Sequence, residues 1–193
     1  MKLLKTSALL AVLSLAGTLA YANPLPENIL SDPDFVSRGE SIVGWKVGGF
    51  AGGNPETGKN YDNSAKLITE EGKTFARVIC DPKFSNFALS PDDRLPLLPE
   101  WTAISVSGMV RIEGLTKTDS WGGFNLSLTF YDFDGKVVGN SGETTLRISD
   151  NQAWKSGLKT ITIPEGATEV AFGLHWLAAG GVADVMNVVL KPQ

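Results

Sequence analysis

The residues that could do chemistry in this sequence are polar side chains at alternating positions of strand-like segments. Side chains alternate between the two faces of a strand, so the apolar positions of such a segment face a core and the others face solvent. If strands carrying polar outward positions are neighbours in one sheet, their side chains converge and can hydrogen-bond the hydroxyl groups of a sugar. The alternative is an ordinary solvated sheet face. The outward set is Arg111, Asn125, Thr129, Tyr131, Arg147 and His175.

Aromatic side chains are the second requirement for sugar recognition, because a flat ring stacks on the apolar face of a pyranose. Trp121 stands before a Gly-Gly pair in a loop between two expected strands, and it is the best candidate for a stacking platform. Phe50 and Tyr61, in the Gly- and Asn-rich loop 48–64, come next. Trp176 alternates in phase with apolar neighbours and is expected in the core, whereas Trp101 follows a loop and is expected nearer the surface.

The elements that must position these residues start with the stretch 101–131. Its two alternating runs are joined by a polar loop, and we expect them to pair as the centre of an antiparallel sheet with one side on a core and one side wet. The core-facing positions are Ile104, Val106, Val110 and Ile112 in the first run, and Leu126, Leu128 and Phe130 in the second.

The rest of the chain reads as further strands separated by turn signals. A hairpin is expected over 65–80 around Glu71-Gly72, and Asp134-Gly135 predicts another tight turn, because such turns need positive φ. A calcium loop there lacks the D-x-D-x-D-G spacing. Other strands are expected at 84–90, 144–148, 158–163, 169–177 and 182–190, with a turn at 151–156. Short, regularly spaced strands indicate an all-β sandwich or barrel.

The ends of the sequence and its charge bound the location and the partners. Lys2 and Lys5, an apolar run 9–19 and the Ala20-Tyr21-Ala22 site predict a bacterial-type signal peptide over 1–22, followed by one exported domain over 23–193, secreted or periplasmic. The net charge is −4 without a basic cluster, which disfavours nucleic acid and anionic membranes as partners. Cys80 is the only cysteine, so it is expected to be a small buried hydrophobe.

Catalysis has little support in the sequence. A glycosidase needs two carboxylates across a cleft, but the candidates stand in turn-like contexts where acidic residues are normal. They are Asp92, Asp93, Asp132, Asp134 and Glu143. His175 is the only histidine, and the sequence shows no partner residues with which it would form a metal site or activate a nucleophile. No hydrolase, metalloprotease or P-loop motif is present. No catalytic residue is therefore assigned, and the Asn125-Leu126-Ser127 sequon is interpreted as chance because it lies inside a strand.

The order of these features resembles carbohydrate-binding modules of the CenC type, in the galactose-binding-like jelly-roll group. The matching features are Asn28-Ile29-Leu30, Phe35, Gly44-Trp45, the stretch 97–101 before a strand, Leu128 to Gly135, Trp154, Ile161 to Ala167, the alternating strand 170–176 and the last strand 185–190. The resemblance implies an antiparallel β-sandwich with a jelly-roll fold, structural roles for Trp45 and Trp154, and non-catalytic binding of a polysaccharide or envelope glycan on a concave sheet face.

This sequence departs from such modules at positions that often help to hold a structural calcium ion. Val36 stands where they often have a carboxylate, and Met186-Asn187-Val188 replaces an Asp-Asp-Val. Asp184 or Glu40 could substitute, but no cofactor is expected, because calcium prefers several hard oxygen ligands. Two other functions remain open from the sequence, an envelope or extracellular domain that binds another protein and a small glycan-active enzyme.

Overall fold

The computed structural model describes residues 25–30, 35, 37–38, 41–42, 45–49, 64–84, 86–91, 93–140 and 143–193. The expected signal peptide and the aromatic candidates Phe50 and Tyr61 lie outside the described residues. Most of the described chain is β-strand, with one short 3₁₀ turn, η1 (Pro82–Phe84). Within these ranges there is no helix with the length and apolar character needed to cross a membrane.

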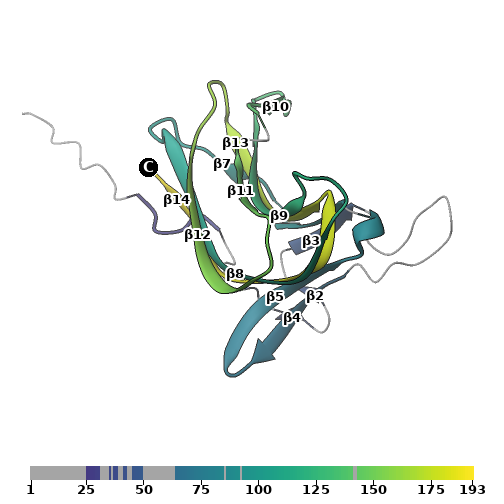
Figure 1. Ribbon diagram of the computed structural model, residues 1–193. Helices are drawn as coiled ribbons and strands as arrows, with labels where there is room; N and C mark the ends of the chain where they lie inside the picture. The colour runs from purple at the N-terminus through teal and green to yellow at the C-terminus, as the bar shows by residue number, and fades with distance from the viewer. Residues whose placement is uncertain are drawn as a thin grey trace, which may run out of the picture.

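Two antiparallel sheets stack on one another (Figure 1). The five-stranded sheet has the order β12-β8-β14-β5-β4. Its strands are β4 (Ser64–Glu70), β5 (Lys73–Cys80), β8 (Ala103–Lys117), β12 (Gln152–Thr162) and β14 (Ala179–Pro192). β8 and β14, its two longest strands, lie side by side near its centre, so this sheet is built on residues far apart in the sequence.

The seven-stranded sheet runs in the order β10-β9-β13-β6-β3, with β11 paired to β9 and β7 paired to β13. Its strands are β3 (Trp45–Gly49), β6 (Asn86–Pro91), β7 (Leu95–Pro96), β9 (Gly123–Tyr131), β10 (Val137–Val138), β11 (Thr145–Ile148) and β13 (Glu169–Leu177). A separate pair, β1 (Ser37–Arg38) and β2 (Ser41–Ile42), precedes it.

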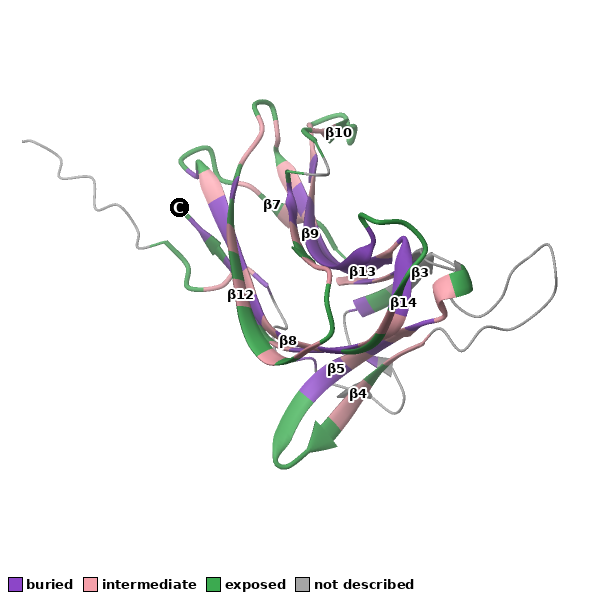
Figure 2. Ribbon diagram, viewed as in Figure 1, coloured by how far each residue is buried: buried purple, intermediate pink, exposed green. Residues whose placement is uncertain are grey.

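The core lies between the two sheets, where the purple segments of Figure 2 face one another. The alternation seen in the sequence sets it, because Val106 and Val110 point inward from β8 while Leu126 and Phe130 point inward from β9. Trp176 is fully buried, and its indole Nε1 donates to the carbonyl oxygen of Val78 at 3.1 Å. The expected all-β antiparallel sandwich is confirmed.

The pairing expected within the stretch 101–131 is wrong. β8 pairs with β12 and β14, whereas β9 pairs with β13, β10 and β11 in the other sheet. The short connection 118–122 therefore crosses the sandwich from one sheet to the other. Alternation tells which side of a strand is apolar, and both strands do turn that side to the core, but it does not tell which strand is the neighbour.

Two tight turns were predicted correctly. Glu71 and Gly72 link β4 to β5 with φ of 52° and 75°, the positive values of a two-residue hairpin turn. Gly135, with φ of 76°, lies in the turn between β9 and β10. In that turn one oxygen of Asp132 accepts hydrogen bonds from the backbone amides of Asp134 and Lys136, at 3.0 and 2.8 Å. The carboxylate thus holds the turn together.

Two local expectations need correction. Where a turn was expected at 151–156, β12 already begins at Gln152, so Trp154 is a strand residue. Trp101, expected nearer the surface, is buried with 9% of its surface exposed. Other expectations are met: Trp45 packs in the core against Phe35, with ring centroids 4.8 Å apart. Cys80 is a buried free cysteine, and burial raises the pKa of its thiol to about 12, because a low-polarity surrounding disfavours the thiolate.

Candidate functional site

The outer face of the seven-stranded sheet gathers most of the residues predicted to bind a ligand. Asn125, Thr129 and Tyr131 point outward from β9. Arg147 on β11 and His175 on β13 both stand directly opposite Asn125, one on each side of it. The expected convergence fails for Arg111, which lies on β8 and therefore points outward from the other sheet. Its strand was taken to be a neighbour of β9, and the crossing at 118–122 separates the two.

At one end of this face an arginine is held over a tryptophan. The guanidinium carbon of Arg147 lies 5.7 Å from the ring centroid of Trp121, and its Nε donates to the side-chain oxygen of Asn125 at 3.1 Å. Asn125 is fully buried, and its amide donates to the carbonyl oxygen of Gly123 at 3.0 Å, which fixes the oxygen toward the arginine. Trp121 is 51% exposed, so its ring is available for stacking.

At the other end a second arginine stacks on a tyrosine. The guanidinium carbon of Arg94 lies 3.6 Å from the ring centroid of Tyr131, and Arg94 donates to the carboxylate of Glu169 at 3.1 Å. Sequence reasoning missed Arg94 and Glu169. Glu169 stands directly opposite Tyr131 in the ladder, so it could have been found if the β9–β13 register had been known. Arg94 lies in a Pro-rich segment that gives no such signal.

Between the two arginine–aromatic pairs the floor is made of small side chains. Ser127 and Thr129 on β9 stand opposite Gly173 and Ala171 on β13. Asn125 and Tyr131 are six positions apart on β9, which corresponds to roughly 20 Å along a strand. The outer face therefore carries small side chains in the middle, with a larger aromatic and cationic group at each end.

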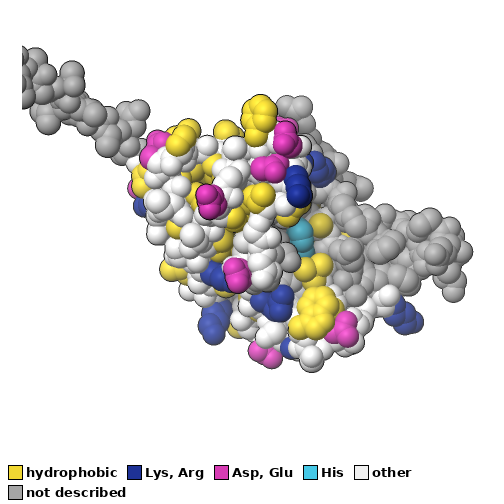
Figure 3. Space-filling view, turned by 90° about the horizontal axis from the view of Figure 1, so that it is seen from above, with side chains coloured by type: hydrophobic (Ala, Val, Ile, Leu, Met, Phe, Trp, Pro, Cys, Tyr) yellow, Lys and Arg dark blue, Asp and Glu magenta, His cyan; other side chains and the backbone are white. Residues whose placement is uncertain are grey.

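The imidazole of His175 lies over Gly173 in this floor. A Cβ atom added to Gly173 would come within 2.0 Å of the Nε2 atom of His175, so the imidazole occupies the space that a side chain at Gly173 would take. Burial lowers the pKa of His175 from its usual 6.5, because the charged form loses hydration. Figure 3 shows the histidine, in cyan, at the surface with basic side chains on two sides of it. A neutral imidazole there can both donate and accept.

The close contact between His175 and Gly173 gives a prediction. Gly173→Ala is expected to push the imidazole outward into water, which should raise the pKa of His175 toward 6.5. An NMR titration of the imidazole protons measures it. In the native protein the unfolded state binds more protons than the folded state between the lowered pKa and 6.5, so stability falls as the pH falls through that window. The variant should lose less stability there, and an unchanged pKa would contradict the contact.

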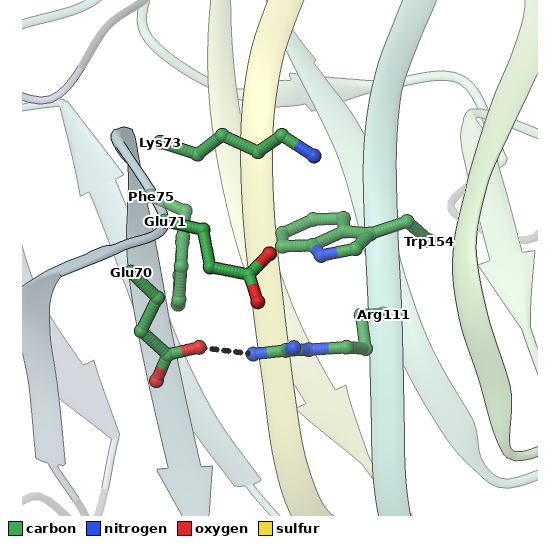
Figure 4. Close-up of a pocket in the computed structure, with 6 residues that line it drawn as sticks. All are labelled: Glu70, Glu71, Lys73, Phe75, Arg111 and Trp154. Atoms are coloured by element: carbon green, nitrogen blue, oxygen red, sulfur yellow. Dashed lines mark hydrogen bonds and ion pairs between the residues drawn. The ribbon is translucent and has the colours of Figure 1, made fainter.

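Arg111 lies on the outer face of the five-stranded sheet in a network of charges. Its Nε donates to Asp184 at 2.8 Å and its Nη2 to Glu70 at 3.1 Å, while Arg77 donates to the other oxygen of Asp184 at 2.7 Å. The hydrogen bond to Asp184 is the main reason that the pKa of each arginine is raised. Arg111 also lines a pocket of about 440 Å³ on this face, together with Trp154, and Figure 4 shows that pocket.

The positions compared with a structural calcium site lie partly outside the described residues. Val36 and Glu40 lie outside the described residues. Asp184, the other proposed substitute ligand, is 2% exposed, and both of its carboxylate oxygens accept hydrogen bonds from Arg77 and Arg111. Those oxygens are therefore already occupied by guanidinium groups. In the described ranges no three His, Cys, Asp or Glu residues gather closely enough to hold a metal ion.

Solved structures with a similar fold include several carbohydrate-binding modules. A structure described as CBM4 is 11% identical, with a TM-score of 0.53, and the match covers 84% of this chain and 98% of that one. The tandem CBM22 modules of Paenibacillus barcinonensis Xyn10C are 13% identical, with a TM-score of 0.55, and the match covers 90% of this chain and 47% of that one. The fold is the jelly roll of carbohydrate-binding modules.

The same fold occurs inside a much larger protein. The enzymatically active domain of tailspike protein 4 from bacteriophage CBA120 is 13% identical, with a TM-score of 0.62, over 86% of this chain. This chain spans about a fifth of that one, since the match covers 21% of the tailspike chain. No protein-family model matches the sequence, and no curated protein is significantly similar to it.

Proposed function

We propose that this protein is an exported, non-catalytic carbohydrate-binding protein that holds a glycan chain along the outer face of its seven-stranded sheet. The observation that carries the proposal is the pattern on that face: two arginine–aromatic pairs, Arg147–Trp121 and Arg94–Tyr131, stand at opposite ends of a floor of small residues. A span of roughly 20 Å between them suits an oligosaccharide rather than a single sugar.

The side chains at the two ends are suited to this role because other residues already hold them in place. Asn125 and Glu169 fix the guanidinium groups of Arg147 and Arg94, so little rotamer freedom is left to lose on binding. The remaining guanidinium N–H groups can donate to sugar hydroxyls. His175, which forms no hydrogen bond through its imidazole with the described residues, adds a neutral donor and acceptor over the floor.

The non-catalytic part of the proposal rests on the carboxylates of this face. Hydrolysis of a glycosidic bond uses a pair of carboxyl groups, one on each side of the bond. Among the outward positions of β9, β11 and β13, which are all described, Glu169 is the only acidic residue, and its carboxylate is engaged by Arg94. A small glycan-active enzyme would need its second carboxylate from another part of the chain.

A glycan-array screen of the mature protein tests the proposal. Trp121→Ala and Tyr131→Ala should each weaken binding about tenfold or more, because each removes a ring that can stack on a sugar. Phe133→Ala is the matched control, since Phe133 is 91% exposed in the turn beyond β9 and its removal should change nothing. The screen is run with calcium and with a chelator, and unchanged binding is expected on chelation.

Two results would count against the proposal. One is a folded protein, checked by circular dichroism, that binds no glycan on the array. The other is glycan binding that the Trp121 and Tyr131 variants leave intact, which would place the ligand elsewhere on the molecule. The first of these would favour the second candidate, a domain that binds another envelope protein, for which the exposed Phe133 and Val137 offer an apolar contact.

A further inference from the structure

A second site lies on the opposite side of the sandwich, on the outer face of the five-stranded sheet. The pocket there has a volume of about 440 Å³, which falls within the usual range for small-ligand sites. It is lined by Glu70, Glu71, Lys73, Phe75, Arg111 and Trp154. In Figure 4 the glutamates and Lys73 come from the β4–β5 hairpin, and Trp154 and Arg111 close the other side.

The aromatic part of the pocket depends on a β-bulge. The pairing of β12 with β8 shifts between Gln152 and Lys155, so that β12 carries one more residue there than its partner. Bulges re-aim side chains and are often found next to functional sites. Here Trp154 reaches across the sheet toward β5, and its ring centroid lies 5.4 Å from that of Phe75, at 72° between planes. Phe75 is thereby covered, whereas Trp154 stays half-exposed.

The guanidinium group of Arg111 supplies a polar part of the pocket, and neighbouring side chains hold it in place. The guanidinium carbon of Arg111 lies 5.1 Å from the Trp154 ring and 5.4 Å from the Phe75 ring. Asp184, which is 2% exposed, and Glu70 hold the same guanidinium through hydrogen bonds. At the mouth, the Glu71 and Lys73 side chains are exposed and have no hydrogen bond or ion pair with another described residue. Their acceptor and donor groups are therefore open to a ligand.

The charges of the lining indicate the class of that ligand. Glu70 and Glu71 oppose Lys73 and Arg111, so two negative and two positive groups cancel around the pocket. A cancelled field favours neither an anion nor a cation. The pocket offers hydrogen-bond donors, acceptors and a half-exposed indole together, and a neutral sugar residue uses all three. We propose that this pocket is a second carbohydrate-binding site, for a neutral sugar residue, on the face opposite the first.

The proposal takes only its ligand class from the proposed function, and it assigns a role to Arg111 that the first face does not. Sites on the two outer faces cannot bind the same short stretch of glycan. They would instead hold two chains, or two parts of one long chain, and so raise the apparent affinity for an insoluble polysaccharide above that for a short oligosaccharide.

NMR of the ¹⁵N-labelled mature protein tests both faces at once, because Trp121 and Trp154 each carry an indole N–H reporter. The signals are assigned with Trp121→Phe and Trp154→Phe variants, and the protein is titrated with soluble neutral cello-, xylo- and galacto-oligosaccharides. We expect at least one of these to shift the Trp154 signal saturably. Lys73→Met should weaken that response about tenfold, the size expected for one charged hydrogen bond, while leaving the Trp121 response unchanged. Lys66→Met, an exposed lysine outside the pocket, is the matched control.

The outcomes separate the two proposals. A Trp154 signal that no oligosaccharide moves overturns the second site, and a Trp121 response in the same titrations leaves the first site standing. The reverse pattern, a response at Trp154 alone, supports the second site and removes the first. A Trp154 response that Lys73→Met and Lys66→Met affect equally would place the sugar outside this pocket and would also overturn the second site.

Discussion

Asp184→Ala is expected to lower the free energy of unfolding by about 3 kcal/mol, the size observed when one partner of a buried ion pair is removed. The carboxylate is 2% exposed and is shared by two arginines: Arg77 donates to both of its oxygens, and Arg111 donates to one of them. Its loss leaves two guanidinium groups close together on one sheet face with only Glu70 between them, and Glu70 is largely solvated. Repulsion and lost hydrogen bonds then act in the same direction.

Urea unfolding followed by circular dichroism measures this loss as a shift of the midpoint at constant slope. Glu113→Ala is the control, since Glu113 lies 3.9 Å from Arg111 but its side chain is 71% exposed, so its ion pair is worth little. The difference between the two variants should persist in high salt, because a buried pair is screened weakly. A loss below about 1 kcal/mol for Asp184→Ala would show that solvent, not Asp184, balances the arginines.

The inner faces of the strands could be predicted from the sequence, because every second residue of a half-buried strand is apolar. The alternation around Val106, Leu126 and Phe172 identified core positions correctly. The neighbours of each strand could not be predicted. The pairing of β8 and β9 depends on the short connection 118–122, whose backbone hydrogen-bonds to the carbonyl oxygen of Ala178, a residue far away in the sequence. This single topological fact moved Arg111 from the expected site to the opposite face.

The candidate sites show the same division. Asn125, Tyr131, Arg147 and His175 share one sheet face, as predicted, because they are outward positions of strands that are neighbours in the sheet. Arg94 and Glu169 were missed because their roles come from side chains meeting across strands, and no local pattern records such a meeting. The pocket beside Trp154 could not be predicted from the sequence either. Trp154 was expected in a turn, but it lies in β12 beside a bulge, and no local pattern marks that bulge.

The connection that crosses the sandwich is also where a single methyl group should do the most damage. A Cβ atom at Gly122 would lie 1.9 Å from the carbonyl oxygen of Ala178, far inside van der Waals contact, and the obstacle is backbone rather than a movable side chain. That same oxygen accepts a hydrogen bond from the backbone amide of Thr118 at 2.9 Å. Gly122→Ala must therefore push apart the β8–β9 connection and the segment between β13 and β14, and we expect it to cost about 3 kcal/mol.

Gly72→Ala separates this steric effect from the general cost of replacing a glycine. Gly72 has φ of 75° and nothing within 4 Å of the added atom, so that variant should lose only about 1 kcal/mol, from backbone strain alone. Urea unfolding compares the two variants, and equal losses would contradict the steric account. Gly122→Ala has a second consequence that Gly72→Ala lacks. Trp121 is its chain neighbour, so displacement of the connection should also weaken glycan binding at the Arg147–Trp121 end, whereas the Trp154 pocket on the other face should keep its response.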